Sequence, residues 1–472
     1  MLEWLKSYVR KAPTPFVAGA EFIYRLIPPK LRYGKGFRDA LHLLEQSEHW
    51  NHRELTAYQE KKLEPLIHHC FANVPYYRRL FDERGLKPQD FQSSEDLKKL
   101  PYLTKRIITR ERNNLIARNM GSWRRDPAHT SGSTGSPFDF YVDDATLSMD
   151  RALALRHMFW LGYRKSDSVA RFRVFRFSNP NKLLEYDRVG RELRLTLDRG
   201  DERELAQTAD ALNSFKPDFI SAWPSCLYVL ARWLKTNRRK IHSPRYIITS
   251  SENLYPHMRE TIEVAIGAPV IDWYGQEESV AVAMQCAEAR GYHIQMEAGY
   301  VELVPRHGGY FEIVGTNLHN FVMPFLRYRT GDLVTGSFGT CTCGRQHPTL
   351  SGIIGRESDL IVTPGNTVVS SLGLNFVFHH LDEVKESQIV QESLNSLHIK
   401  VVPWNKLGTH TLKTLEKRVR EHMQWDAMDI RVEQVDHIPR NAGGKRPFFL
   451  SHVQLHDSAV MQVIPTASGQ QN

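Results

Sequence analysis

Short apolar runs alternate with helical segments between residues 168 and 273, and this alternation restricts the fold more than any other feature of the chain. The runs have the length and apolar content of buried strands, whereas the segments between them carry apolar residues at helical spacing. The predicted strands are 169–177, 219–222, 246–249 and 270–273, and the predicted helices are 205–215, 227–237 and 255–266. Such alternation predicts a parallel sheet covered by helices. Because ligands bind at the carboxyl ends of the strands in these sheets, we expect a functional site in the loops that follow them.

The segments on either side of this region have a different character. Residues 1–100 are predicted to be mainly helical, with one helix at 52–71, and a further long helix is predicted at 143–162. Three runs typical of antiparallel strands lie at 301–304, 310–316 and 325–328. Beyond a junction at 352–359, a compact α+β unit is predicted from strands at 382–390, 397–402 and 430–435 and a helix at 411–425. The predicted fold class is therefore α/β (α+β), with a large multi-layer domain of mixed sheets and a small α+β domain.

The charge balance favours anionic partners. The chain has 472 residues, with 62 Lys and Arg against 53 Asp and Glu, which gives a net charge of +9 and a pI near 9.2. Nucleotide phosphates, acidic membrane surfaces and nucleic acid all carry the complementary charge. The sequence contains no block dense in lysine and arginine with interleaved aromatic residues. We therefore expect no nucleic-acid partner.

The cysteines and the N-terminal residues favour a cytoplasmic protein. Five cysteines form an odd, sparse set, which is not the pattern of a disulfide framework. Residues 1–11 are amphipathic and charged, so we expect neither a signal peptide nor an integral membrane segment. This stretch forms either a helix packed on the body of the protein or a helix on a membrane surface. The second alternative would place the protein at the inner membrane face.

A turn of small residues precedes the alternating region. Ser131, Gly132, Ser133, Thr134 and Gly135 follow one another without a large side chain. Glycine allows positive φ and close backbone approach, while Ser and Thr supply hydroxyl groups, so successive N–H groups are able to converge on an anion such as a triphosphate. The alternative interpretation is a flexible surface turn. The stretch is not a Walker loop, because the spacing and the lysine of that motif are absent.

Five further motifs follow this turn in order. They are Ser250–Leu254, Trp273–Glu278, Arg327–Asp332, Gly355–Asp359 and Arg440–Lys445. The ordered set resembles the adenylate-forming superfamily of acyl- and aryl-CoA synthetases, and within it the phenylacetate–CoA ligase-like branch and the CapK-type proteins of capsular-polysaccharide loci. The segments Leu31–Gly34, Asn73–Tyr77 and Cys341–Arg345 resemble the same branch. Members of the superfamily activate a carboxylate with ATP, release pyrophosphate and pass the acyl group to a thiol or another nucleophile.

The resemblance implies a role for each motif. Ser131–Gly135 would cradle the β and γ phosphates, and the stretch that begins with Ser251 and Glu252 would lie along the adenine, against which Tyr274, followed by Gly275, would stack. Glu278 would hold Mg²⁺, Asp332 would bind the ribose hydroxyls and Arg356 would lie near the nucleotide. Lys445 would contact the carboxylate and the α-phosphate, so that Lys445 and Glu278 are the predicted catalytic residues. The implied domains are an adenylation domain at 1–355 and a mobile domain at 356–472 that ends in a disordered tail, with Asp359 as the hinge.

Two positions depart from the pattern of the superfamily. Many acyl-CoA synthetases have a lysine two residues after the second glycine of the phosphate loop, whereas Ser136–Asp139 contains none. Phosphate neutralisation must then depend more on N–H groups and Mg²⁺. In addition, Glu277 stands where the Tyr-Gly motif usually carries Ser or Thr. This extra carboxylate either alters the affinity for Mg²⁺ or turns away from the metal.

Three cysteines and a histidine form a candidate metal site. Cys286, His293, Cys341 and Cys343 supply three thiolates and one imidazole, which is a donor set for tetrahedral structural zinc. The spacing alone is a weak signal, and the alternative is three ordinary buried thiols beside an unrelated histidine. Relatives in the phenylacetate–CoA ligase-like branch carry the same set, and the resemblance implies that it binds zinc here.

The predicted function is that of an ATP-dependent ligase that makes an acyl- or aryl-adenylate from a carboxylic acid. Its cofactors would be ATP and Mg²⁺, with structural zinc, and its acceptor would be CoA, a carrier-protein thiol, or an amine or hydroxyl of a sugar precursor. One alternative is a catalytically impaired nucleotide-binding homologue that acts as a partner in polysaccharide assembly. Another is an enzyme that leaves AMP attached to its acceptor without forming a thioester.

Overall fold

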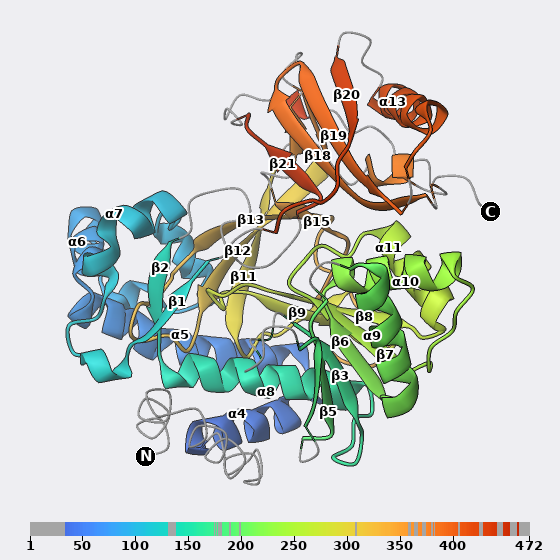
Figure 1. Cartoon of the computed structure of the whole chain (residues 1–472). Helices are drawn as coiled ribbons and strands as arrows, with labels where there is room; N and C mark the ends of the chain where they lie inside the picture. The colour runs from blue at the N-terminus through green and yellow to red at the C-terminus, as the bar shows by residue number, and fades with distance from the viewer. Residues whose placement is uncertain are drawn as a thin grey trace.

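A computed structural model describes most of the chain (Figure 1). The described residues are 34–130, 138–173, 175, 177, 182–187, 190–197, 200–306, 309–356, 360–362, 367–370, 374–378, 381, 383–404, 406–423, 428–440, 447–453 and 460–461. The predicted N-terminal amphipathic stretch and the predicted C-terminal tail lie outside these residues.

The described part of the N-terminal region is helical, as predicted. It comprises α4 (Gly34–Ser47), α5 (His52–Asn73), α6 (Pro75–Arg84) and α7 (Lys105–Leu115), with the 3₁₀ turns η1 (Pro88–Asp90), η2 (Ser94–Lys99) and η3 (Ser122–Arg124). Helix α5 begins at a capping box in which Asn51 and Glu54 exchange side-chain and backbone hydrogen bonds. Pro75 occupies the first turn of α6, where its missing N–H costs nothing. These local signals explain why the periodicity of 52–71 predicted a helix correctly.

A nine-stranded mixed sheet forms the centre of the molecule. Its order is β14-β10-β9-β8-β7-β6-β3-β5-β4, and the five strands from β8 to β5 run parallel. The bounds are β3 (Val169–Phe172), β4 (Leu184–Asp187), β5 (Glu192–Leu195), β6 (Phe219–Ala222), β7 (Tyr246–Ser250), β8 (Val270–Gly275), β9 (Val282–Gln285), β10 (Tyr292–Ile294) and β14 (Thr349–Leu350). The parallel sheet is confirmed. The strand expected over 169–177 ends at Phe172, and the β4–β5 hairpin that follows was not predicted.

Helices cover both faces of the parallel strands. Helices α9 (Glu202–Phe215), α10 (Pro224–Thr236) and α11 (Pro256–Ile266) pack against one face through residues such as Ile220 and Val270. The end of α8 (Asp144–Trp160) and the residues after it pack against the other face through the alternate residues Phe219 and Ile271. The strands are therefore buried on both sides, which explains why they appear in the sequence as continuous apolar runs.

A smaller antiparallel sheet lies beside the large one. Its order is β11-β12-β13-β15, with β11 (Gly299–Pro305), β12 (Tyr310–Asn317), β13 (Tyr328–Thr335) and β15 (Ile353–Arg356). It shares a hydrophobic core with α5, α6 and α7. The strand expected over 325–328 was wrong in its bounds, because β13 begins at Tyr328. Arg327 just before it has a φ of +51°, which interrupts the extended chain.

The C-terminal residues form the predicted α+β unit, drawn in orange and red at the top of Figure 1. One sheet has the order β20-β19-β18-β21 and the other has the order β16-β17-β22. The bounds are β16 (Leu360–Val362), β17 (Thr367–Ser370), η6 (Asn375–Phe378), β18 (Val384–Ser393), β19 (Ser396–Pro403), α13 (Thr409–Met423), β20 (Asp429–Gln434), β21 (Phe449–Ser451) and β22 (Val460–Met461). This unit packs on the helices of the large sheet, where the rings of Tyr255 and Phe448 lie 5.3 Å apart.

No described helix combines the length and the apolar character that a membrane crossing requires.

Candidate active site

Two of the predicted motifs leave the large sheet side by side. Ser250 at the end of β7 is opposite Trp273 in β8, so Ser251 and Tyr274 follow at the same edge of the sheet. Ser251 has a φ of +72°, which turns the chain sharply out of the strand. The carboxylate of Glu252 accepts a hydrogen bond of 3.0 Å from the N–H of Ser225 at the start of α10. Glu252 therefore anchors this loop to a helix N-terminus.

The third motif reaches the same place from the small sheet. The hydroxyl of Tyr274 donates a hydrogen bond of 2.7 Å to Oδ2 of Asp332, and the amide of Gln276 donates to the Tyr274 hydroxyl. Burial and the carboxylate of Asp332 raise the pKa of Tyr274 well above its ordinary value, so this phenol remains a donor. Asp332 in β13 is directly opposite Arg356 in β15, and Nε of Arg356 lies 3.6 Å from Oδ1 of Asp332. Tyr274, Asp332 and Arg356 thus meet at one corner between two sheets.

Of the two adjacent glutamates, only Glu278 is buried. Glu278 is only 6% exposed, and its Oε1 accepts a hydrogen bond of 2.8 Å from the hydroxyl of Tyr328. Burial is the main cause that raises the pKa of Glu278, while the hydrogen bond from Tyr328 and the charge of Lys105 lower it. Glu277 is exposed. The geometry favours the alternative in which Glu277 turns away from a metal at Glu278.

Lys105 is a cation of this site that sequence reasoning missed. It is the first residue of α7, and its ammonium is electrostatically coupled to Arg356, Glu278 and Asp332. Solvent still reaches the side chain, but partial loss of hydration and repulsion from Arg356 lower the pKa of Lys105, against the effect of the two carboxylates. The only local signal was a helix start, in which the hydroxyl of Thr104 accepts a hydrogen bond of 3.3 Å from the N–H of Ile107.

The backbone fixes Lys105 at the small sheet. The N–H of Leu103 donates to the carbonyl of Arg327 at 3.0 Å, and the N–H of Arg329 donates to the carbonyl of Leu103 at 2.9 Å. Residue 103 therefore forms a bridge to Tyr328, the residue that binds Glu278. These bonds hold the segment around Lys105 against the Arg-Tyr-Arg-Thr-Gly-Asp motif, which lies more than two hundred residues later in the sequence.

A second unpredicted cation lies at the carboxyl edge of the parallel strands. Nη2 of Arg173 lies 3.3 Å from Oγ of Ser221 and 3.5 Å from Oγ of Ser250, and Nη1 donates to the carbonyl of Phe172 at 2.7 Å. Burial lowers the pKa of Arg173 to about 10, so the guanidinium remains charged at neutral pH. Together with Lys105 and Arg356, it makes this edge suited to an anionic ligand.

Several predicted residues lie outside the described part of the chain: Ser131, Gly132, Ser133, Thr134, Gly135, Asp359 and Lys445. The strands that flank the predicted phosphate turn, β1 (Asp126–His129) and β2 (Asp139–Val142), pair in antiparallel register. The base of the turn is closed by a hydrogen bond of 3.2 Å from the N–H of Thr130 to the carbonyl of Phe138. The ring of Phe138 lies 6.4 Å from that of Tyr328, so the base of the turn is near the hydrogen-bond donor to Glu278.

The four candidate zinc ligands come together. Cys286 follows β9, His293 lies in β10, and Cys341 and Cys343 lie between β13 and β14, yet their donor atoms all lie within 4.8 Å of one another. Sγ of Cys286 is 3.7 Å from Sγ of Cys341, and Sγ of Cys343 is 3.4 Å from Nε2 of His293. A tetrahedral zinc with bonds of about 2.3 Å to sulfur requires sulfur–sulfur distances of about 3.8 Å. The donor set and its spacing therefore fit zinc.

Groups around these ligands fix the orientation of His293. Its Nδ1 lies 3.4 Å from the carbonyl oxygen of His347, so that Nε2 is directed at the cysteines. The ring of His347 contacts the buried carboxylate of Glu297, which pairs with Arg156 of α8 at 2.7 Å. The loop that carries Cys341 and Cys343 is in this way tied to α8.

Comparison with known proteins finds similarity to CapK and to phenylacetate-coenzyme A ligases. Residues 361–451 match the family model described as the CapK C-terminal domain. The chain is 23% identical to Protein CapK of Staphylococcus aureus over 90% of this chain and 94% of that protein. It is 29% identical to phenylacetate-coenzyme A ligase of Escherichia coli over 74% of this chain and 82% of that enzyme.

The fold is shared with a solved CoA ligase. The structure of 2-hydroxyisobutyryl-CoA ligase in the postadenylation state, in complex with R3-HIB-AMP, matches with a TM-score of 0.68 and 20% identity, covering 86% of this chain and 91% of that one. The resemblance predicted from the motifs is confirmed: the chain is related to CapK and to the phenylacetate-CoA ligases, and its fold is that of the adenylate-forming CoA ligases.

Proposed function

We propose that the protein is an ATP-dependent ligase that activates a carboxylic acid as its adenylate. One observation carries this proposal: Tyr274, Asp332 and Arg356 meet at one corner of the molecule. Tyr328, which binds Glu278, is bridged there by residue 103, two positions before Lys105. Two carboxylates and two cations at that corner suit a ligand that combines hydroxyl groups with a polyphosphate. The relation to phenylacetate-coenzyme A ligases of several bacteria supports the same reaction class.

In this mechanism the described residues position the nucleotide. Asp332, held by Tyr274 and Arg356, would accept hydrogen bonds from the ribose hydroxyls. Ser251, Glu252 and Gly275 would border the adenine at the edge where β7 and β8 end. Glu278 would hold Mg²⁺, which neutralises phosphate charge when bound. Lys105 and Arg356 would supply fixed positive charge to the phosphates. Lys105 of α7 would thereby take the role of the lysine that the phosphate loop lacks.

The chemical step is an in-line displacement at phosphorus. A carboxylate oxygen of the acid attacks the α-phosphorus of ATP, a new bond forms between them, and the bond to the bridging oxygen breaks as pyrophosphate leaves. Ser131–Gly135 would contact the leaving phosphates, and Lys445 would contact the carboxylate and the α-phosphate. Because Lys445 belongs to the proposed C-terminal domain at 356–472, rotation about Asp359 would bring it in and withdraw it.

The second step would transfer the acyl group from AMP to an acceptor. A thiol is favoured, because both the phenylacetate-coenzyme A ligases and the solved fold neighbour are named as CoA ligases. The likeness to CapK over nearly the whole chain favours a role in cell-surface polysaccharide synthesis, with a carrier-protein thiol or a sugar precursor as the acceptor. Either role is compatible with a cytoplasmic protein.

We also propose that a structural zinc ion binds to Cys286, His293, Cys341 and Cys343. Among the described residues, these four would be the only ligands of the zinc. The site would connect the strand after the Glu278 loop to the loop after β13, and β13 carries Asp332. It would brace the active-site corner without contacting the substrate.

An impaired nucleotide-binding homologue is the main rival. Its support in the sequence was the missing phosphate-loop lysine and the extra Glu277. The described geometry weakens both points, since Lys105 supplies a cation and Glu277 is exposed.

The test is carboxylate-dependent exchange of labelled pyrophosphate into ATP, measured across a panel of carboxylic acids. We expect exchange with at least one acid, its loss in Lys445→Ala, and retained ATP binding in that variant. Mass spectrometry of the product after addition of CoA then distinguishes a thioester from a stable AMP conjugate. ATP binding without exchange for any acid would favour the non-catalytic homologue.

A further inference from the structure

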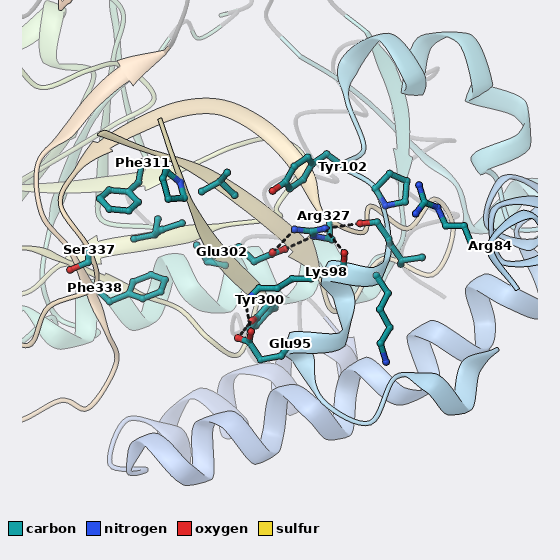
Figure 2. A pocket seen from close by; sticks show the side chains of 17 residues that line it. Arg84, Glu95, Lys98, Tyr102, Tyr300, Glu302, Phe311, Arg327, Ser337 and Phe338 are labelled. Atoms are coloured by element: carbon teal, nitrogen blue, oxygen red, sulfur yellow. Dashed lines mark hydrogen bonds and ion pairs between the residues drawn. The ribbon is translucent and has the colours of Figure 1, made fainter. Parts of the chain in front are cut away.

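A groove runs along the outer edge of the small sheet, apart from the active-site corner. It has a volume of about 770 Å³ and is lined by η2 and the residues after it, by six consecutive residues of β11 (300–305), and by Phe311, Ser337 and Phe338. Figure 2 shows Phe311 and Phe338 at one end, Tyr102 and Arg327 in the middle, and Arg84 at the other end. Nothing in the proposed ligase reaction uses these side chains.

The groove follows the unpaired side of an edge strand. Strand β11 is the terminal strand of its sheet and pairs only with β12. At the end of this hairpin, the N–H of Arg306 donates to the carbonyl of Tyr310 at 2.8 Å. Backbone hydrogen-bonding alternates along an antiparallel strand, so residues 302 and 304 also face β12, whereas Val301, Leu303 and Pro305 turn their backbone groups outward.

These outward groups form a short template for another strand. Within the part of the chain that the structure describes, the backbone N–H and C=O of Val301 and Leu303 make no hydrogen bond across this edge. The template is bounded at both ends. The side chain of Gln59 donates to the carbonyl of Gly299 at 2.8 Å, and Pro305 has no N–H. An unpaired strand edge is a common site for an extended peptide to bind by adding a strand.

The charges of the groove indicate what kind of segment fits. Its lining contains four basic residues, Arg84, Lys98, Lys99 and Arg327, against two acidic ones, Glu95 and Glu302, a difference of +2. Both carboxylates are already engaged: Arg327 binds Glu302 through two nitrogens at 2.8 and 2.9 Å, and Lys98 binds Glu95. The same pairs engage Lys98 and Arg327, and Lys99 pairs with Asp96 at 2.8 Å, so Arg84 is the lining cation that stands outside these pairs. An acidic segment would meet no unpaired carboxylate in the lining and would find Arg84 as a partner.

A second copy of this chain is a poorer occupant. Pairing two β11 edges would bring two grooves of the same positive charge together, in a chain whose net charge is already +9. Phe311 and Phe338, the latter 46% exposed, add an apolar surface to the groove. The lining therefore suits a partner strand in which apolar and acidic side chains alternate.

We propose that the β11 edge binds an extended acidic segment of a partner protein by strand addition, with backbone hydrogen bonds to Val301 and Leu303 and an acidic side chain near Arg84. This docking is independent of the ligase reaction and holds or fails separately from it. It would place an acidic partner beside the enzyme without blocking the nucleotide corner.

The probe is a short fluorescein-labelled peptide of alternating glutamate and valine, titrated with the full chain. We expect a Kd on the order of 10–100 μM by fluorescence polarisation. A matched peptide of alternating lysine and valine should bind at least about tenfold more weakly. Leu303→Pro removes an N–H that β12 does not use and should also weaken binding by about tenfold, whereas Leu303→Ala keeps that N–H and should bind nearly as well as the unmodified protein.

Hydrogen exchange provides a second measurement. The amide of Leu303 should exchange faster than that of Glu302 in the free protein and should become protected when the glutamate peptide is added. If Leu303→Pro fails to fold, the unmodified protein is tested with a glutamate–valine peptide carrying N-methyl groups on alternate residues, which is expected not to bind. Equal binding of the lysine and glutamate peptides, equal binding by Leu303→Pro, or no change in Leu303 exchange would overturn the proposal. So would concentration-dependent dimerisation that Leu303→Pro abolishes, since the occupant would then be a second copy.

Discussion

The hydroxyl of Tyr274 donates a 2.7 Å hydrogen bond to Oδ2 of Asp332, a residue 58 positions further along the chain. Tyr274 is near the end of β8 in the nine-stranded sheet, and Asp332 lies in β13 of the small sheet. The bond therefore joins the two sheets at the active-site corner. Because Arg356 is opposite Asp332, the same contact also sets where that cation lies. The proposed nucleotide site is a product of how the two sheets pack.

Lys105→Ala is expected to impair adenylation. If the Lys105 ammonium contacts phosphate, its loss should remove about 2 kcal/mol of transition-state binding, or about 30-fold in kcat/KM for ATP. Pyrophosphate exchange measures this directly. Lys105→Arg should recover part of the activity, and Arg106→Ala, which changes the next, exposed residue, should leave it unchanged. Normal exchange in Lys105→Ala would remove this lysine from the site.

The two adjacent glutamates should respond differently to substitution. Glu278→Gln keeps an acceptor for the Tyr328 hydroxyl but loses the charge for Mg²⁺, so we expect exchange to fall by about 100-fold or more. Glu277→Gln should stay within about threefold of the unmodified enzyme, because Glu277 is exposed. Similar losses in both variants would contradict the assignment.

The pH profile provides an independent check on Glu278. Burial raises its pKa in the free protein, so the carboxylate becomes protonated at a higher pH than an exposed glutamate does. Protonated Glu278 is unable to hold Mg²⁺, and exchange should therefore fall on acidification. Because Mg²⁺ favours the charged form, raising its concentration should move this acid limb to lower pH. A limb that does not respond to Mg²⁺ would point to another group.

Metal analysis of freshly purified protein should find about one zinc per chain. Cys343→Ser should lower this content sharply, because Sγ of Cys343 lies 3.4 Å from Nε2 of His293 in the cluster. Cys226→Ala changes a buried cysteine of α10 outside the cluster and should keep the zinc. Loss of zinc should lower the melting temperature, because a closed structural site adds binding free energy to folding. Freshly purified protein without stoichiometric zinc would refute the site.

Asp150 should make the protein less stable at neutral and alkaline pH than at acidic pH. Burial raises its pKa to about 7, with a smaller contribution from Glu277, while the Ser279 hydroxyl at 2.7 Å opposes the shift. The folded state then binds a proton that the unfolded state releases at lower pH, so stability is highest below the unfolded pKa and falls as pH rises towards 7. Asp150→Asn should raise the free energy of unfolding at pH 8 by on the order of 2–4 kcal/mol and change it little at pH 4.

Thermal melts of Asp150→Asn and the unmodified protein at the two pH values measure this effect. The exposed Asp436→Asn is the control and should show no pH-dependent difference. An equal effect of Asp150→Asn at both pH values would mean that the carboxylate is charged throughout.

Local signals were sufficient for most elements. Helix α5 was predictable because its apolar spacing and its capping box lie within one continuous segment. Strands β6, β7 and β8 were predictable because burial on both faces leaves continuous apolar runs. The β4–β5 hairpin was missed, because Leu184–Asp187 and Glu192–Leu195 are mixed in polarity and the hairpin joins the sheet through the parallel pairing of β5 with β3.

The amino-acid sequence by itself determined the order of the motifs, the chemistry of Glu278 and Asp332, and the donor set of the candidate zinc site, because these depend on residue type and spacing. Only the tertiary structure decided that Glu278 rather than Glu277 is buried, and that Lys105 joins Glu278 and Asp332. Adjacent residues of a loop have no periodicity that tells which one faces inward. The place of Lys105 depends on a backbone bridge from residue 103 to Tyr328. Such long-range contacts depend on the packing of whole sheets, so no local sequence pattern indicates them.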